Sequence, residues 1–367
     1  MSSSCGKRIR LSIFGQSHSA AVGAVIEGLP AGFRVDMERL DSFMKRRAPG
    51  GPLATPRREG DRIEFLSGIA GGRLCGSPLC LIIRNADARP GDYSEFRDVP
   101  RPGHADYTSS VKYGGFQDAS GGGHFSGRLT APLTAAGGVC LQILEARGIF
   151  VGAHLKSVGG VEDRAFDPAS VSRADFNARF FSPLTVLDAA AGARMAAAIE
   201  AARAEGDSLG GVVECAAVGL PAGLGEPIFG GLESGIASLV FGIPAVKGVE
   251  FGSGFAAAAM RGSEHNDPFV CEDGAVITAT NHAGGILGGI STGMPLVFRA
   301  AFKPTPSIAR AQRTLSLRTM QLTELNIKGR HDPCVAVRAV PAVEAAAAVA
   351  LCDALLPGNY EPLKGAE

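Results

Sequence analysis

Three turns of the chain carry side chains that could transfer protons. His18 follows a short apolar segment, His104 lies in the sequence RPGHAD, and Asp332 lies in the sequence RHDP. Imidazole titrates near neutral pH and a carboxylate can accept a proton, so these residues suit general acid–base chemistry. A lone histidine is more commonly structural, and spacing alone does not bring three distant segments together. They are therefore candidates that need a fold to unite them.

The stretch from residue 101 to residue 138 also has the features of an anion site. The triple glycine Gly121–Gly123 is followed by His124, Ser126 and Arg128, and then by a run of small apolar residues. The N–H groups of a Gly-rich turn that leads into a helix can bind an anion, and Arg128 and Arg101 could add bidentate contacts. Such a turn often does no more than connect two elements. The density of polar residues around it favours a site, because polar groups are costly to bury without partners.

A second cationic segment, residues 45–58, contains five basic residues and no acidic one. The chain as a whole has 36 basic and 36 acidic residues, so its formal net charge is zero. That balance argues against general binding to nucleic acid or to a membrane surface. The segment is either a solvated loop or a clamp for a polyanionic ligand.

Alternating strands and helices must position these residues. We expect strands at 9–14, 21–27, 63–65, 79–83, 149–158, 212–218, 246–251 and 295–302. We expect helices at 36–47, 129–144, 189–204, 232–240 and 341–356, the last with proline in its first turn.

Two glycine-rich patterns occur twice, in the same order. GLPAG is found at 28–32 and 219–223, and GGxxxGxPL at 71–79 and 288–296. The offsets are 191 and 217 residues, so the second copy would hold an insertion of 26 residues. We predict a single domain, 1–367, with an internal duplication of about 20–84 and 211–301. Chance recurrence of glycine-rich pieces is the alternative.

The composition indicates a cytoplasmic protein. The eight cysteines are scattered without a CxxC pair, and no signal peptide precedes the first strand. The uncharged stretch 274–298 contains many glycines together with Asn281 and His282, so it does not resemble a membrane span.

Seven segments, in order, resemble the chorismate synthase family. They are FGQSHSAAVGAVIEGLPAG, RPGHADYTSSVKYG, the triple glycine with Ser126 and Arg128, AVKGVEFGSGF, NHAGGILGGISTG, KPTPS and GRHDPCVAVRAVP. The resemblance runs from about Ile9 to Leu356. It implies an α+β fold, a β-α-β sandwich with helices between two antiparallel sheets and an internal pseudo-twofold, commonly assembled as a homotetramer.

The resemblance also implies an activity. The family's enzymes are lyases of the shikimate pathway of aromatic amino-acid biosynthesis. They catalyse the 1,4-elimination of phosphate from 5-enolpyruvylshikimate 3-phosphate, which gives chorismate. They require reduced FMN although the reaction has no net redox change, and NADPH is a candidate reductant for that flavin. The implied partners are a small-molecule substrate and further copies of the chain, with no nucleic acid and no membrane.

Residue roles carry over by motif. His18 matches the histidine thought to protonate the departing phosphate, His104 the one thought to protonate reduced flavin, and Asp332 the aspartate proposed to help flavin N5 take up the ring proton. The implied substrate contacts are Arg46, Arg47, Arg101, Arg128 and Arg330. The implied flavin contacts are His124, Phe125, Ser126, Pro244, Ala245, Gly288, Lys303, Pro304, Thr305, Pro306, Ser307 and Arg330.

The chain departs from the family pattern at several positions. Gln16 replaces a glutamate of the first motif, and His124-Phe125 replaces an Arg-Ser pair after the triple glycine. Leu53 stands where the family often has an arginine associated with reduced nicotinamide. These changes affect the expected flavin contacts and any built-in flavin reductase activity.

Two other functions fit parts of the pattern. The HAD and HD sequences at 104–106 and 331–332 resemble ligand pairs for a hard or borderline cation, as in a metal-dependent phosphohydrolase. A non-catalytic flavin- or phosphate-binding module would need the glycine turns and arginines, but not His18, His104 and Asp332 together.

Overall fold

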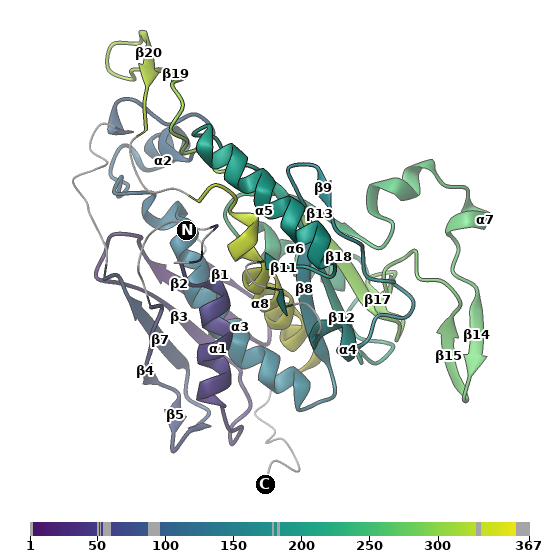
Figure 1. Ribbon diagram of the computed structural model, residues 1–367. Helices are drawn as coiled ribbons and strands as arrows, with labels where there is room; N and C mark the ends of the chain where they lie inside the picture. Colours follow the sequence, from purple (N-terminus) through teal and green to yellow (C-terminus); the bar gives the residue numbers. More distant parts are fainter. Residues whose placement is uncertain are drawn as a thin grey trace.

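The computed structural model describes residues 3–49, 51, 53, 60–86, 96–177, 180–181, 184–327 and 332–356. In it, two five-stranded antiparallel sheets enclose a layer of helices (Figure 1). The first sheet has the order β1 (Ser4–Cys5), β2 (Arg10–Gly15), β3 (Ala21–Glu27), β7 (Leu79–Arg84) and β4 (Ile63–Ser67). The second has the order β13 (Val246–Phe251), β18 (Leu296–Phe302), β12 (Gly211–Val218), β8 (Phe150–Val158) and β9 (Val161–Glu162). This is the α+β sandwich that the sequence predicted.

Four helices form the middle layer. They are α1 (Met37–Arg47), α3 (Thr130–Glu145), α6 (Leu232–Phe241) and α8 (Ala336–Leu355). Helix α3 packs on β3 and β7, α8 packs on β8 and β12, and the two helices pack tightly on each other. A Cβ atom at Gly137 would lie 2.3 Å from the Cβ of Ala345, so glycine is needed for this close approach.

The remaining elements lie at the edges or in connections. Helix α5 (Ala189–Ala204) packs along the β8–β9 edge of the second sheet. The smaller elements are α2 (Asp106–Tyr113), α4 (Arg173–Asn177), α7 (Gly262–His265), η2 (Gly123–Phe125), η3 (Gly127–Leu129), η4 (Ile228–Gly230), η5 (Gly254–Ala259), β5 (Ile69–Ala70), β6 (Arg73–Leu74), β10 (Phe180–Phe181), β11 (Leu184–Thr185), β14 (Phe269–Glu272), β15 (Ala275–Thr278), β16 (Ile286–Leu287), β17 (Ile290–Ser291), β19 (Gln312–Leu315) and β20 (Leu322–Leu325). In the described part of the chain, no helix has the length and apolar character that a membrane crossing requires.

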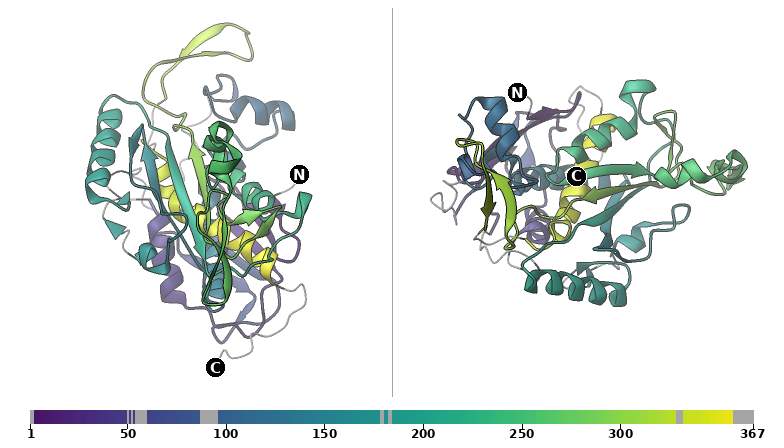
Figure 2. Two further views of the ribbon diagram at one scale, coloured as in Figure 1. Left: turned by 90° about the vertical axis from the view of Figure 1, so that its right-hand side faces the viewer. Right: turned by 90° about the horizontal axis from the view of Figure 1, so that it is seen from above.

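Both halves follow one order of elements. Strands β2-β3-β7-β4 of the first sheet correspond to β8-β12-β18-β13 of the second, and each set contains a helix, α1 or α6, and a small hairpin, β5–β6 or β16–β17. The second half adds residues 252–285 before its hairpin. These include α7 and the β14–β15 hairpin, an arm that projects from the sheets (Figure 1 and Figure 2).

The two GLPAG segments have the same local structure. Each follows a sheet strand, and its first glycine has a positive φ, +87° at Gly28 and +80° at Gly219. A Cβ at Gly28 would lie 2.1 Å from the carbonyl oxygen of Arg8, and a Cβ at Gly219 would lie 2.2 Å from that of Gly148. Both carbonyls lie two residues before the neighbouring strand. We propose that residues of about 20–84 and 211–301 arose by duplication.

One predicted boundary is wrong. Helix α8 begins at Ala336 rather than at Pro341, so this proline lies inside the helix. Proline there lacks the N–H that would complete a helical hydrogen bond. The helix persists because nearly its whole length is buried between α3 and the second sheet.

A row of alternating charges crosses the second sheet. His154, Glu214, Arg299 and Glu250 occupy neighbouring register positions on β8, β12, β18 and β13. The Nε2 atom of His154 lies 3.0 Å from Glu214 Oε2, and its Nδ1 atom lies 3.2 Å from Asp163 Oδ2. Burial lowers the pKa of His154, but its hydrogen bonds and attraction to the two carboxylates outweigh burial, so the pKa is raised.

This row predicts a loss of stability as the pH rises above about 6.5. Because the pKa of His154 is higher in the folded state, its contribution is fully present below the unfolded-state pKa of about 6.5 and is lost as pH rises through the folded-state value. We expect the urea midpoint to fall over that pH range, and we expect His154→Gln to flatten the decline. An equally steep decline in His154→Gln would assign it to other groups.

Candidate active site

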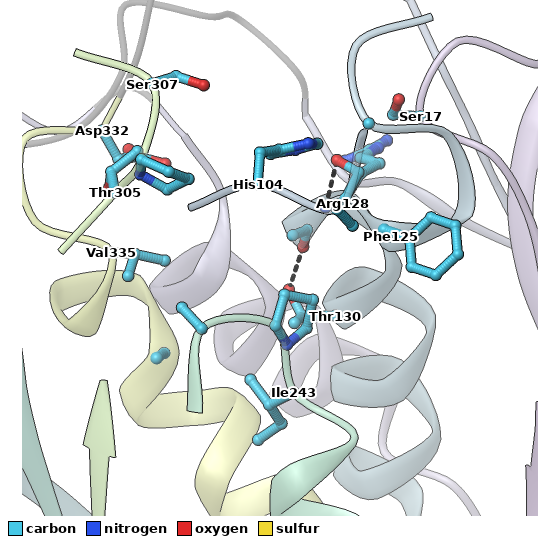
Figure 3. A pocket seen from close by; sticks show the side chains of 18 of the residues that line it. Ser17, His104, Phe125, Arg128, Thr130, Ile243, Thr305, Ser307, Asp332 and Val335 are labelled. Atoms are coloured by element: carbon cyan, nitrogen blue, oxygen red, sulfur yellow. Dashed lines mark hydrogen bonds between the residues drawn. The ribbon is translucent and has the colours of Figure 1, made fainter. Parts of the chain in front are cut away.

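A cavity of about 530 Å³ lies where the N-terminal ends of α3 and α8 meet (Figure 3). Its walls include the C-terminal end of α1, the start of α3, the α6–β13 turn and the start of α8. Corresponding segments of the two halves therefore line one cavity. Its volume falls within the range of about 300–1,000 Å³ that is typical of small-molecule sites.

The cavity brings together the three acid–base candidates. His18, His104 and Asp332 all line it, although they are far apart in the sequence. His18 comes from the turn between β2 and β3, His104 from the turn before α2, and Asp332 from the segment before α8. Figure 3 shows Asp332 beside Thr305 and Ser307, with His104 between these residues and Arg128.

The triple-glycine turn accommodates both imidazole rings. Gly121 has a φ of +70°, and a Cβ there would lie 2.2 Å from Cε1 of His18. A Cβ at Gly122 would lie 3.5 Å from Nε2 of His104. Ser17 joins the first ring to this turn, because its N–H donates to the carbonyl oxygen of Gly123 at 3.0 Å and its Oγ lies 2.9 Å from Nδ1 of His18. Glycine at 121 is thus required by the packing of His18.

His104 is held by a carboxylate that the sequence analysis considered only as a metal ligand. Its Nδ1 atom lies 2.6 Å from Oδ1 of Asp106, the first residue of α2. Burial alone would raise the pKa of Asp106. Hydrogen bonds from Arg101 and His104 have a larger effect in the opposite direction, so the pKa lies well below its usual range. Asp106 is therefore ionised at any working pH.

Asp332 is paired with an arginine that lines the same cavity. Nη1 of Arg338 donates to Oδ2 of Asp332 at 2.8 Å, and its Nε donates to the carbonyl oxygen of Arg47 at 3.0 Å. The sequence analysis did not select Arg338. The available signal was a single arginine in the otherwise apolar run from Cys334 to Val343, because a charged residue in such a run needs a partner.

Asp61 joins two of the predicted anion-binding arginines. Its side chain is fully buried; Oδ2 accepts from Arg47 Nη1 at 2.5 Å, and Oδ1 accepts from Arg128 Nη1. Arg128 Nε also donates to Oδ1 of Asn85 at 2.9 Å. Burial, partly offset by Asp61, lowers the pKa of Arg47 to about 10. The three charged groups give this wall a net charge of +1.

A loop after β18 forms the opposite wall. Lys303, Thr305, Pro306 and Ser307 line the cavity, and Ala245 faces them from the α6–β13 turn with a φ of +75°. Burial, together with nearby Lys247, lowers the pKa of Lys303. Oγ1 of Thr305 is buried and has no hydrogen-bond partner among the described residues. A buried polar atom without a partner, in a cavity wall, is suited to a ligand.

Other residues implied by the resemblance lie elsewhere. Arg46 donates to Glu344 at 2.6 and 2.9 Å, and Gly288 lies in the β16–β17 turn; neither they nor Pro304 line the cavity in the described structure. Arg330 lies outside the described residues.

The departures from the family pattern have local explanations. His124, which lines the cavity, lies 2.7 Å from Oγ of Ser3 and 2.8 Å from the carbonyl oxygen of Gly15, so it ties the glycine turn to the first sheet. Leu53 is 3% exposed and belongs to the hydrophobic core.

The described residues do not form a metal centre. Within them, no group of three or more His, Cys, Asp or Glu side chains is placed to hold an ion. Asp106, half of one suggested ligand pair, is bonded to Arg101 instead.

Comparison with known proteins gives a consistent result. The family model described as chorismate synthase matches residues 9–356. The chain is 50% identical over 353 residues to "Chorismate synthase" of Aeropyrum pernix, covering 96% of this chain and 92% of the relative. It is 48% identical over 352 residues to that of Korarchaeum cryptofilum, covering 96% of each chain. A solved structure, "Crystal Structure of Chorismate Synthase", superposes with a TM-score of 0.76 at 28% identity, covering 96% of this chain and 93% of the other. The chain therefore belongs to the chorismate synthase family.

Proposed function

We propose that the cavity binds 5-enolpyruvylshikimate 3-phosphate together with reduced FMN. The chain is a carbon–oxygen lyase of aromatic amino-acid biosynthesis, and its reaction is the 1,4-elimination of phosphate that yields chorismate. The observation that carries the proposal for the site is the convergence of His18, His104 and Asp332 on one cavity whose wall contains Arg47 and Arg128.

The arginine wall is suited to the substrate. The substrate carries a phosphate and two carboxylates, and guanidinium groups bind such anions through charge-assisted hydrogen bonds. Arg47 and Arg128 retain a net charge of +1 after pairing with Asp61. The positive charge of Arg101 is balanced by Asp106, so the assignment of Arg101 as a substrate contact stays a prediction.

Proton transfer is divided among the acid–base residues. His18 donates a proton to the departing phosphate, and its ring is held against the glycine turn for this task. With reduced FMN bound, His104 would be the residue that exchanges a proton with it. Asp332 assists the uptake of the proton that leaves the ring carbon, and Arg338 holds the carboxylate of Asp332 in place.

The residues present fit reduced FMN. Oγ1 of Thr305 needs a partner, and Lys303 supplies a cation. When bound, reduced FMN supplies an electron-rich ring that eases departure of phosphate from the allylic carbon. Because Leu53 is buried in the core, it supplies no contact to NADPH. We propose that this chain has no flavin reductase activity of its own and receives FMN already reduced.

Assembly and location follow the family expectation. Ile228, Phe229 and Leu287 are 78%, 93% and 48% exposed, and such apolar side chains favour self-association. This supports the proposed homotetramer. All eight cysteines are free, which supports the proposed cytoplasmic location.

An anaerobic assay tests the function. Purified protein, the phosphorylated substrate and chemically reduced FMN should form chorismate without net consumption of the flavin. Oxidised FMN, or no flavin, should support no turnover under the same conditions. Equal turnover without reduced flavin would refute the cofactor proposal. Stoichiometric metal and phosphate release without chorismate would favour a phosphohydrolase, and flavin binding without turnover a binding module.

A further inference from the structure

We propose that Asp106 is a positioning residue that keeps the proton on Nδ1 of His104, so that Nε2 is the atom that exchanges a proton in the cavity. We further propose that Arg101 holds Asp106 in place. The inference concerns residues that no motif assignment gave this role. It rests on the proposed acid–base function of His104, and the experiment below separates the two.

The carboxylate of Asp106 is fixed from several sides. Oδ2 accepts hydrogen bonds from the backbone N–H of Arg101 at 3.0 Å and from its Nε at 2.7 Å. Oδ1 accepts from Nη2 of Arg101 at 2.7 Å and lies 2.6 Å from Nδ1 of His104. Asp106 is also in the first turn of α2, where a negative charge is favoured. The carboxylate has no freedom to turn away from the imidazole.

Arg101 connects the three loops around His104. Besides Asp106, its guanidinium donates to the carbonyl oxygen of Gly121 at 3.0 Å and to Oγ of Ser307 at 3.4 Å. Its Cζ lies 4.5 Å from the ring centre of Phe96, and its side chain is 2% exposed. Because its charge is paired and its side chain is buried, Arg101 holds these loops in place.

A count of the hydrogen atoms that Arg101 can donate shows that Nδ1 of His104 carries a proton. This atom lies 2.6 Å from Asp106 Oδ1 and 3.1 Å from Arg101 Nη2. Nη2 carries two hydrogens, and Asp106 Oδ1 and the Gly121 carbonyl oxygen accept both of them. None remains for His104, so Nδ1 must itself carry a hydrogen and donate it to Asp106.

The other ring nitrogen is thereby left for chemistry. Nε2 of His104 makes no hydrogen bond to another described residue, and it lies beside Gly122 in the cavity wall. With Nδ1 protonated, Nε2 is bare in the neutral ring and carries the second proton in the imidazolium. Both forms are competent for proton exchange.

Asp106→Asn should reverse this arrangement. The amide oxygen of asparagine should take the place of Oδ2, because two N–H groups of Arg101 point there. Its NH₂ group then faces Nδ1 of His104, which must become an acceptor, and the proton moves to Nε2. We expect turnover to fall about 10²–10⁴-fold, as when the carboxylate that orients a catalytic histidine is replaced. We expect KM for the substrate to change less than about threefold, since Asp106 does not line the cavity wall.

The readout is the histidine tautomer. In ligand-free, ¹⁵N-histidine-labelled protein, the His104 signals, assigned by their loss in His104→Gln, should show Nδ1–H in the original chain and Nε2–H in Asp106→Asn. Asp106→Glu keeps the charge, so it should keep the original tautomer and recover part of the turnover. It also remains informative if Asp106→Asn folds poorly.

A matched control lies elsewhere in the chain. Asp267 contacts His282 through the same pair of atoms, Oδ1 and Nδ1, at 3.0 Å, and neither residue lines the cavity in the described structure. Asp267→Asn makes the same change of functional group beside a histidine and should leave turnover unchanged.

Each outcome decides a separate claim. An unchanged His104 tautomer in Asp106→Asn, or the altered tautomer in Asp106→Glu, overturns the positioning role. An altered tautomer with normal turnover overturns its catalytic relevance. Normal turnover in His104→Gln instead defeats the proposed acid–base function of His104, whatever the tautomer shows.

Discussion

Replacing Asp332 with asparagine should lower turnover by about 10²–10⁴-fold, the usual contribution of a positioned acid or base. Asparagine has a similar shape, and its amide oxygen can still accept the hydrogen bond that Arg338 donates to Asp332 at 2.8 Å. The variant should therefore fold and bind FMN and the substrate, but it lacks a group that can take up a proton. Single-turnover rates with pre-reduced FMN under anaerobic conditions measure the chemical step directly.

The control for this variant should alter an equivalent ion pair away from the cavity. Asp207 accepts from Nη1 of Arg310 at 2.9 Å, and Asp207→Asn changes the same functional group without touching the site. Turnover in that control should be normal. If Asp332→Asn also reacts at a normal single-turnover rate, the carboxylate is structural, and the proton must leave carbon by another route.

The local features of the fold could be predicted from the sequence because local residues determine them. The carboxylate of Asp36 accepts from the N–H of Arg39 at 3.0 Å and begins α1 as expected. The strand pattern at 21–27 and the GLPAG turn after it are also found as predicted. Each of these features depends on residues within one turn or one strand.

Features that depend on distant partners were not predicted. Helix α2, with the sequence DYTSSVKY, has a weak apolar pattern, and α8 extends past Pro341 only because its surroundings bury it. The assignment of Arg101 as an anion contact stays a prediction, and no spacing rule shows that Asp106, five residues later, balances its charge. Arg338 and Asp61 were missed because contacts that hold them come from other segments: Arg338 donates to the carbonyl oxygen of Arg47, and Asp61 is paired with Arg128.

The buried position of Asp61 leads to the second large effect. Arg47 and Arg128, 3% and 4% exposed, both donate to this one carboxylate. Asp61→Asn leaves two buried guanidiniums near each other without a counterion. Removing one partner of a buried ion pair costs about 3–5 kcal/mol, because the remaining charge is neither solvated nor paired. We expect a loss of that size in the free energy of unfolding, measured by urea denaturation.

Two comparisons show whether repulsion between the arginines causes this loss. Glu64→Gln breaks an exposed pair with Arg84 in the neighbouring strands and should leave the urea midpoint unchanged. Adding Arg128→Gln to Asp61→Asn removes one of the two uncompensated charges, so the double variant should be less destabilised than the sum of the single changes. Simple additivity would mean that Arg128 has no part in the loss.

The same variant links stability to anion binding. In Asp61→Asn the wall that contains Arg47 and Arg128 has a charge of +2 instead of +1, so an anion can take over the role of the missing carboxylate. A ligand that binds only the folded state raises the free energy of unfolding by mass action. Inorganic phosphate should therefore raise the urea midpoint of Asp61→Asn more than that of the original chain, while sodium chloride of equal ionic strength should not. If phosphate stabilises both proteins equally, the two guanidiniums do not face the anion site, and the substrate's phosphate and carboxylates must be bound by other cations of the cavity.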